Sequence, residues 1–294
     1  MNTGTLSKQA PPCKTLAVPA QEDDPDIRAK YRPFLLGDEI ESSDWISELE
    51  LDGVLDMARQ NIESTGSRLK VLVLYGSLRK RSYSRLTAYE AARILHRLGC
   101  DVRVYDPSGL PIRDSVAAEH PAVQELRSLS MWSDGHIWCS PEQHGNLTGI
   151  FKNQIDWIPL STGSLLMLWV FSHKLRSAEE VSLPGLIQVN GGSQSFNAVN
   201  SLRILGRWMR MFTIPNQSSI PTAYKHFEDE GGDGSGKARL LPSSNRDRLV
   251  DVMEEFVKYT IIMRPHFDLF GSRHSERKEA AAKAAAVFAA EATK

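Results

Sequence analysis

Apolar and polar stretches alternate along the central part of the chain and predict strands and helices in turn. Val71–Tyr75 is apolar without alternation, which is typical of a strand covered on both faces. A helix is expected over Ser84–Leu98, with apolar residues at helical spacing and Gly99 as its stop. The remaining strands are expected at Val102–Tyr105, His136–Cys139, Leu186–Val189 and Phe212–Ile214, and the remaining helices at Pro121–Ser133, Thr148–Trp157, Phe196–Met211 and Asn245–Met263.

This alternation predicts an α/β fold, a doubly wound parallel five-stranded sheet. Such sheets bind ligands at the carboxyl ends of their strands, where the strand order reverses. In the flavodoxin-like order 2-1-3-4-5, the first, third and fourth strands are neighbours. The loops that leave these three strands are the most polar, glycine-bearing loops of the core. We therefore expect this order, with one ligand site where the three loops meet.

The composition outside this core predicts extensions at both ends. We expect an N-terminal tail and arm over 1–66, a flavodoxin-like domain over 67–265, and a C-terminal extension over 266–294 that ends in an Ala-rich helical tail from Glu279. Residues 1–30 have little apolar content and predict disorder. The apolar patch Tyr31–Leu36 fits either a cover for its own domain or an arm that reaches a neighbouring subunit, and a short helix fits within Ser43–Gln60. Residues 161–184 match no simple pattern.

Charge and cysteine usage narrow the class of protein. The 294 residues carry a formal net charge of -1, which favours neither nucleic acid nor a membrane surface as the partner. The three cysteines are too scattered for a disulfide framework or a metal site. The N-terminal residues lack a basic stretch followed by an apolar one, so we expect no secretory signal, and the longest apolar run, Leu165–Phe171, is too short to span a bilayer. We expect a soluble, cytoplasmic protein that acts on small molecules.

The loop after the first strand has the chemistry of an anion site. It places hydroxyls and cations between a strand and the start of a helix, whose free N–H groups and dipole favour a negative ligand. The Walker A pattern is absent, and a dinucleotide fingerprint needs three glycines where only Gly76 is present. Ser77, Ser82 and Ser84 as donors, with Arg79 as a fork, suit a terminal phosphomonoester. The alternative is a solvated basic turn.

The loops after the third and fourth strands suit a flat ligand. Pro141 and Gly145 fix the backbone of the first of them, and Gly191 and Gly192 leave backbone open to close approach in the second. A heterocycle held by peptide N–H groups fits between two such loops. That description matches a flavin ring whose phosphate end lies in the first loop.

Three stretches of the chain carry a family resemblance. GSLRKRSYSR, WCSPEQHGNLTGIFKNQIDW and VNGGSQSFNAVNSLRILGRWMRM resemble the NADPH-dependent FMN reductase superfamily, and more narrowly its ArsH branch, over about Tyr31 to Glu279. The resemblance implies a flavodoxin-like fold, bound FMN, NADPH as donor and a homotetramer. It also implies reduction of quinone, azo-dye, ferric or dioxygen acceptors and, in ArsH proteins of arsenic resistance, oxidation of trivalent organoarsenicals.

The resemblance also implies site residues. By position in the motifs, the residues implied to bind the FMN phosphate are Ser77, Arg79, Ser82, Tyr83 and Ser84. Those implied to line the ring are Pro141, Glu142, Gln143, His144 and Gly145, and those implied to contact its far edge are Gly192, Ser193 and Gln194. Hydride transfer at flavin N5 needs no protein acid or base, so we expect no catalytic side chain. We expect His144 to position the ring, Glu142 to be structural, and Cys139 to be a packed thiol.

One segment departs from the ArsH pattern. The family continues with an Arg-Pro-Thr-Gln-Gly turn where this chain has LLMLWVFSHKLRSAEEVSLP at 165–184. The usual arginine, expected to contact the NADPH phosphate, has no clear match, which places NADPH binding in question more than FMN binding. We hypothesise that a faulty gene model retained non-coding sequence here. A spliced transcript that encodes 165–184 as written would end that hypothesis.

Two alternatives to a flavoenzyme stay open at this point. Asp106 closes the second strand, where a dinucleotide fold holds a ribose, so a flavin-free NAD(P)-dependent dehydrogenase is conceivable. The missing glycines argue against it. A non-enzymatic electron carrier like flavodoxin is the other alternative, although flavodoxins tend to be smaller and strongly acidic.

Overall fold

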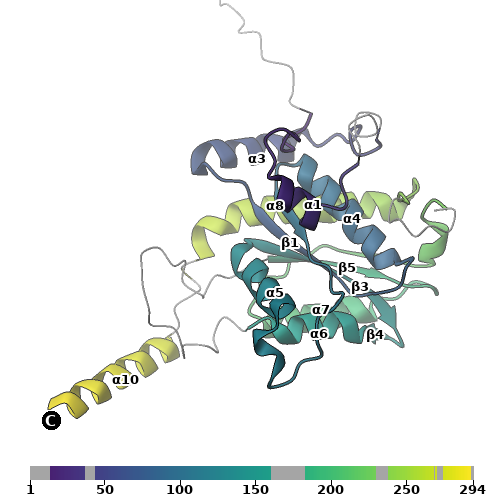
Figure 1. The fold of residues 1–294 in the computed structure, drawn as a ribbon. Helices are drawn as coiled ribbons and strands as arrows, with labels where there is room; N and C mark the ends of the chain where they lie inside the picture. Colours follow the sequence, from purple (N-terminus) through teal and green to yellow (C-terminus); the bar gives the residue numbers. More distant parts are fainter. Residues whose placement is uncertain are drawn as a thin grey trace, which may run out of the picture.

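The computed structural model describes residues 14–36, 44–159, 183–229, 238–267, 269 and 274–292. Its centre is a parallel sheet in the order β2-β1-β3-β5-β6, and a short strand β4 pairs antiparallel with the end of β3 (Figure 1). The strands are β1 (Lys70–Tyr75), β2 (Asp101–Val104), β3 (Gly135–Gln143), β4 (Asn146–Leu147), β5 (Leu183–Val189) and β6 (Gln217–Ile220). Counting the parallel strands alone, this is the predicted flavodoxin-like order, which is confirmed.

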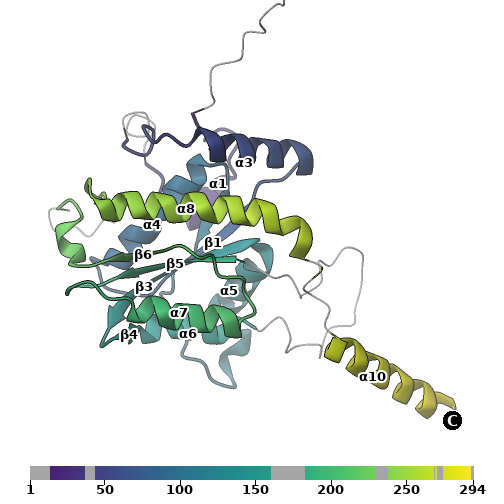
Figure 2. The ribbon, with the colours of Figure 1, turned by 180° about the vertical axis from the view of Figure 1, so that it is seen from behind.

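Helices cover both faces of the sheet, as Figures 1 and 2 show. On one face lie α4 (Tyr83–Arg97) and α8 (Ser244–Met263), with α3 (Asp52–Thr65) packed against α8. On the other lie α5 (Pro121–Trp132), α6 (Gly149–Trp157) and α7 (Asn197–Trp208). The 3₁₀ turns are Ala117–Glu119, Ala223–Lys225 and Arg264–His266, and helix α10 (His274–Ala292) lies apart from the sheet.

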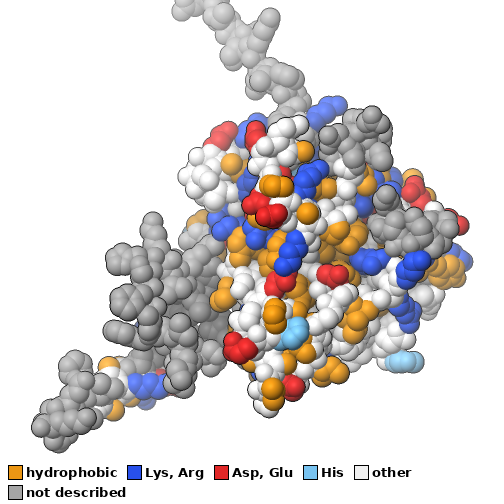
Figure 3. Space-filling model, in the orientation of Figure 1, with side chains coloured by type: hydrophobic (Ala, Val, Ile, Leu, Met, Phe, Trp, Pro, Cys, Tyr) orange, Lys and Arg blue, Asp and Glu red, His pale blue; other side chains and the backbone are white. Residues whose placement is uncertain are grey.

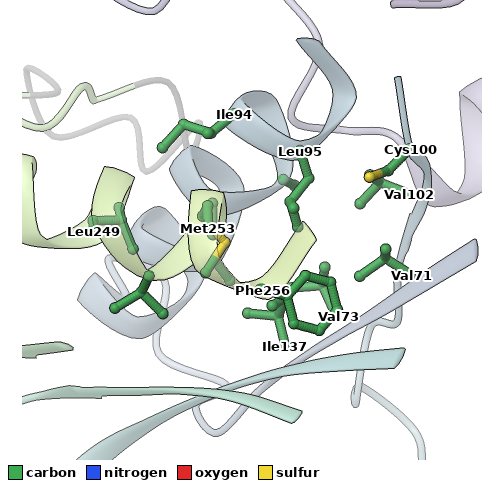
Figure 4. Packing of buried hydrophobic residues seen from close by; sticks show 14 of the residues in the cluster. Val71, Val73, Ile94, Leu95, Cys100, Val102, Ile137, Leu249, Met253 and Phe256 are labelled. Carbon is green, nitrogen blue, oxygen red and sulfur yellow. The ribbon is translucent and has the colours of Figure 1, made fainter. Parts of the chain in front are cut away.

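The unbroken apolar strands are explained by burial on both sides. Alternate residues of β1 enter different apolar clusters: Val71 and Val73 pack toward α4 and α8, whereas Leu72 and Leu74 pack toward α5 and α6. Figure 4 shows Phe256 among the strand side chains of the first cluster. Hydroxyl side chains cap three of the helices, and these are Ser82 for α4, Thr148 for α6 and Ser243 for α8.

Two strand predictions were wrong in their bounds. The last strand is β6, Gln217–Ile220, and not Phe212–Ile214. The prediction missed it because its two serines are polar, as in a turn, although they are buried. The third strand does not end at Cys139 but continues to Gln143, where pairing with β4 extends it as a hairpin. The other strands lie within a few residues of their predicted positions.

The predicted disorder of residues 14–30 was also wrong. Helix α1 (Pro25–Tyr31) forms there, with Asp24 as its cap. The Arg32 guanidinium, which is buried, pairs with Asp23 and donates a 2.7 Å hydrogen bond to Asp101. Residues 1–13 lie outside the described part. The short helix expected within 43–60 begins later and is α3.

The patch Tyr31–Leu36 covers its own domain. Phe34 is completely buried, and its carbonyl oxygen accepts a 2.6 Å hydrogen bond from Arg93 Nε of α4. Residues 160–182, which hold most of the atypical segment, lie outside the described residues. The domain boundaries at 66 and 265 stay predictions. Over the described ranges, no helix is both long and apolar enough to cross a bilayer.

Candidate functional site

The sheet brings the three predicted loops together. Tyr75 of β1 lies in register with Cys139 of β3, which lies in register with Ile187 of β5. Because all three strands are parallel and adjacent, the loops that follow them leave the same edge. The sequence-predicted site residues therefore belong to one edge of the sheet.

The first loop keeps donors available at the start of α4. Ser82 Oγ accepts a hydrogen bond from Arg85 N at 3.2 Å and lies 3.1 Å from Ser84 Oγ, with both serines buried. Ser77 Oγ accepts from Arg79 N at 3.3 Å. The Arg79 side chain is exposed, and no described residue offers it a hydrogen-bond or ion-pair partner. Figure 3 shows Lys and Arg side chains gathered near the start of α4. This is a donor set suited to an anion.

Arg81, unlike Arg79, bonds to another part of the chain. Arg81 Nη2 donates a 2.7 Å hydrogen bond to the carbonyl oxygen of Glu228, and its guanidinium lies 5.4 Å from the ring centre of Tyr83. Tyr83 in turn packs against Phe227, with ring centres 5.8 Å apart. Arg81 and Tyr83 therefore join the first loop to the segment before residue 229.

Gly76 is required by packing, which the sequence did not reveal. A Cβ there would lie 2.7 Å from Thr148 Oγ1 and 2.9 Å from Phe151 Cβ. The Gly76 amide donates to the Cys139 carbonyl at 3.0 Å. Thr148 packs against Gly76 and so joins the end of β1 to the start of α6; it was not predicted as a site residue. A threonine at the capping position before an apolar helix is the sequence pattern that could have identified it.

The second loop is a tight hairpin and not an open loop. His144 and Gly145 have positive φ values of 51° and 72°, as a type I′ turn between β3 and β4 requires. Gln143 and His144 are exposed at its tip, whereas Pro141 is partly covered. The hairpin gives the predicted ring residues a rigid backbone.

Glu142 links the second loop to the third. Its Oε2 accepts hydrogen bonds from Gln188 Nε2 and Ser195 Oγ, each at 2.7 Å, and from Ala198 N at 3.4 Å in the first turn of α7. These contacts agree with the structural role expected for Glu142. Gln188 and Ser195 are further residues that sequence reasoning missed, because a buried polar network leaves no short motif.

The third loop is open at its glycines. A Cβ on Gly191 or Gly192 would meet no atom within 4 Å, and Ser193 and Gln194 are exposed. The turn is anchored from beneath, since Asn190 Nδ2 donates to the Ser193 carbonyl at 2.6 Å. The glycines therefore leave bare backbone accessible at the edge of the sheet.

The titratable side chains beside the loops include two that are buried, Cys139 and Tyr75, and one that accepts hydrogen bonds, Asp106. Cys139 is completely buried and therefore a packed side chain, as predicted, and this burial raises the pKa of its thiol. Burial, followed by the charge of Asp106, also raises the pKa of Tyr75. Asp106 Oδ1 accepts hydrogen bonds from Tyr75 Oη and Ser108 N, both at 3.0 Å. No cluster of metal-ligating side chains occurs in the part of the chain that the structure describes.

The donor set fits FMN. The uncommitted Arg79 guanidinium and the serine hydroxyls at the start of α4 match a terminal phosphate, and the open glycine turn opposite a rigid hairpin matches a flat ring. The fold and site thus define a flavodoxin-like α/β protein whose first loop carries donors suited to an anion.

Comparison with known proteins gives the family. A family model described as NADPH-dependent FMN reductase matches residues 69–225. The protein named NADPH-dependent FMN reductase ArsH from Rhizobium meliloti (strain 1021) is 55% identical over 216 residues, which are 74% of this chain and 82% of the relative. The protein of the same name from Shigella flexneri is 51% identical over 213 residues, covering 72% of this chain and 76% of the relative. The chain belongs to the NADPH-dependent FMN reductase family, in its ArsH branch, and is an oxidoreductase.

A solved structure agrees on the fold. The flavoenzyme NAD(P)H:(acceptor) oxidoreductase FerB from Paracoccus denitrificans superposes with a TM-score of 0.50 over 65% of this chain and 96% of its own. At 18% identity this likeness concerns the fold alone.

Proposed function

We propose that this chain is an FMN-dependent NADPH oxidoreductase of ArsH type that reduces small-molecule acceptors such as quinones, azo dyes, ferric ions or dioxygen. The observation that supports the proposal is the row Tyr75, Cys139 and Ile187, because the three loops that follow these parallel strands leave the same edge of the sheet. Bound FMN would supply hydride acceptance from NADPH and electron transfer to the acceptor.

The proposed roles of the residues follow the resemblance and the donor chemistry. The phosphate would be held by Ser77, Arg79, Ser82, Tyr83 and Ser84, and the ring by Pro141, Glu142, Gln143, His144, Gly145, Gly192, Ser193 and Gln194. Glu142 would act through the loops, since its carboxylate is already bonded to Gln188 and Ser195. No side chain needs to move a proton for hydride transfer, so the chain's part is orientation and exclusion of water.

The alternatives are less well supported. In a flavin-free dehydrogenase Asp106 would bind a ribose, but the chain lacks the second and third glycines of the dinucleotide fingerprint. A pure electron carrier would not consume NADPH steadily, whereas the relatives are named as NADPH-dependent reductases.

An arsenic-resistance role is proposed from the ArsH name of the relatives. The substrate would be a trivalent organoarsenical, oxidised to the pentavalent form with two electrons passed to dioxygen, which is released as hydrogen peroxide, while water supplies the oxygen atom that arsenic gains. Trivalent arsenic binds thiols, but Cys100 and Cys139 are buried and burial raises the pKa of both thiols. The substrate would therefore bind beside the FMN, at the edge of the sheet that the three loops leave, and not to these cysteines.

Assembly as a homotetramer in the cytoplasm is a further part of the proposal. Ile204, Trp208 and Phe212 are 54%, 66% and 48% exposed on and just after α7, an apolar surface that a second copy of the chain would cover. Free Cys100 and Cys139 are compatible with a reducing compartment.

The test is a titration followed by turnover. Protein freed of flavin is titrated with FMN, and NADPH oxidation is then followed with a quinone. In a separate reaction under air, without NADPH, the conversion of methylarsenite to its pentavalent form is followed. We expect a yellow protein and steady NADPH oxidation that depends on the quinone. A folded protein that stays colourless in excess FMN would overturn the proposal, and a yellow protein without NADPH oxidation would favour the electron carrier.

A further inference from the structure

Gln188 is an unusual residue for its position. It lies in β5, whose seven residues are all buried between β3 and β6, and it carries the strand's only polar side chain. The side chain is completely buried. Burying an amide is unfavourable unless its donors and acceptor are bonded, so an apolar residue would be the simpler choice here.

The amide is bonded in three directions. Gln188 Nε2 donates to Glu142 Oε2 at 2.7 Å and to the Ser195 carbonyl at 3.0 Å, and Gln188 Oε1 accepts from Val199 N at 3.0 Å. Both protons of the amide are used. One side chain thus contacts the β3–β4 hairpin, the loop after β5 and the first turn of α7.

Further hydrogen bonds connect the partners of Gln188 to one another and form a network. Ser195 Oγ donates to Glu142 Oε2, and the Ser195 carbonyl also accepts from Ser219 Oγ of β6 at 2.7 Å. The Glu142 carboxylate lies at the N-terminus of α7, where a negative charge is favoured. A network whose members are mutually satisfied is rigid, because moving one breaks several bonds.

We propose that Gln188 is a positioning residue for flavin binding: together with Glu142 and Ser195 it sets the separation between the hairpin and the glycine turn that accept the ring. This inference rests on the proposed function. Gln188 itself lies beneath the loops and acts through Glu142 and Ser195. The network does not include the first loop, so phosphate recognition is independent of it.

The test compares FMN with riboflavin, which lacks the phosphate. In Gln188→Leu the buried volume is kept and the three hydrogen bonds are lost. We expect the Kd of FMN and the Kd of riboflavin to rise by the same factor, about tenfold or more, because the buried hydrogen bonds that hold the two loops together are lost. The ratio of the two constants should stay unchanged, and the absorption spectrum of the bound flavin should shift.

Two further variants keep the test decisive if Gln188→Leu folds poorly. Ser195→Ala removes the hydroxyl that donates to Glu142, and Glu142→Ala removes the oxygen that accepts from Gln188, Ser195 and Ala198. Both positions are less buried than Gln188, and both variants should raise the two constants in parallel. Thr260→Val is the control, since it removes a buried hydroxyl that bonds only the Phe256 carbonyl within α8. It should lower the melting temperature and leave both constants unchanged.

The outcomes separate this inference from the proposed function. If the unaltered protein binds no FMN, the proposed function fails. If it binds FMN, and folded Gln188→Leu or the two other variants retain the original constants and spectrum, Gln188 is merely structural and the inference is overturned.

Discussion

The Thr148 hydroxyl donates a 2.6 Å hydrogen bond to the carbonyl oxygen of Gly76, so the cap of α6 also holds the end of β1. Thr148 Oγ1 accepts a hydrogen bond from Phe151 N, and Thr148 N donates to Ser140 Oγ, each at 3.3 Å. The corner between the first and second loops is therefore a packed joint. Its integrity depends on the absence of a side chain at Gly76.

Gly76→Ala should destabilise the protein. The added Cβ would lie under 3 Å from both Thr148 and Phe151, where neither the cap nor the helix moves freely. We expect the free energy of unfolding to fall by about 1 to 3 kcal/mol, as overpacking typically costs. Urea unfolding measures it. The matched control is Gly53→Ala in α3, where a Cβ meets nothing within 4 Å and stability should hold or rise slightly. Equal effects at the two glycines would contradict the packing argument.

Glu90→Gln should be among the most destabilising conservative changes. Glu90 is completely buried in α4, and its carboxylate pairs with Arg239 at 2.7 and 3.0 Å and accepts from Leu240 N at 3.0 Å. Removing its charge leaves the partly buried Arg239 with less compensation. We expect a loss of about 3 to 5 kcal/mol in the free energy of unfolding.

The control for that prediction is the same substitution on the surface. Glu254→Gln breaks the exposed pair between Glu254 and Lys258 of α8, which is 2.6 Å long. Exposed pairs contribute at most about 1 kcal/mol, so little change is expected. Chemical denaturation of both variants decides, and a similarly small loss for Glu90→Gln would show that the buried pair is dispensable.

His136 should make stability depend on pH. Burial lowers its pKa from the ordinary 6.5 to about 4, and Trp138 Nε1 donates to its Nδ1 at 3.2 Å. Between these values the unfolded chain binds a proton that the folded chain refuses. The free energy of unfolding should therefore fall as pH drops from 6.5 toward 4, by up to about 1.4 kcal/mol per pH unit.

The comparison with His136→Gln isolates this effect. The variant cannot take up the proton, so it should lose less stability than the unaltered protein between pH 7 and pH 5. His96, whose pKa burial also lowers to about 4, is present in both proteins and cancels in the difference. Urea unfolding at several pH values measures it, and a difference that does not change with pH would refute the assignment.

Arg79→Ala should weaken FMN binding selectively. The exposed guanidinium has no partner among the described residues, and a charged hydrogen bond to phosphate contributes about 1.5 to 3 kcal/mol. We expect the Kd of FMN to rise about tenfold to a hundredfold while the Kd of riboflavin stays the same. Fluorescence titration of both ligands measures this. Lys80→Ala, one residue on, is the control and should have a smaller effect; an equal effect would indicate a diffuse field in place of a contact.

Local pattern was sufficient for most elements of this fold. Unbroken apolar runs such as Val71–Tyr75 predicted strands covered on both faces. The helical patterns between these runs predicted the crossover connections of a parallel sheet. The pattern failed at β6, because Ser218 and Ser219 are polar yet buried, and at α1, where the decisive contacts come from Arg32 bonding to Asp101, which is distant in the sequence.

The candidate site divides along the same line. The sequence by itself determined most of the strands, the cationic first loop and the glycines of the third, because strand periodicity and backbone freedom are local properties. The strand order was expected only because the three polar loops meet in it, and the structure decided it. Only the tertiary structure decided why Gly76 cannot carry a side chain and how Glu142, Gln188 and Ser195 join two loops. Those features depend on distances between residues as far as 75 positions apart, such as Gly76 and Phe151, and no local pattern records such distances.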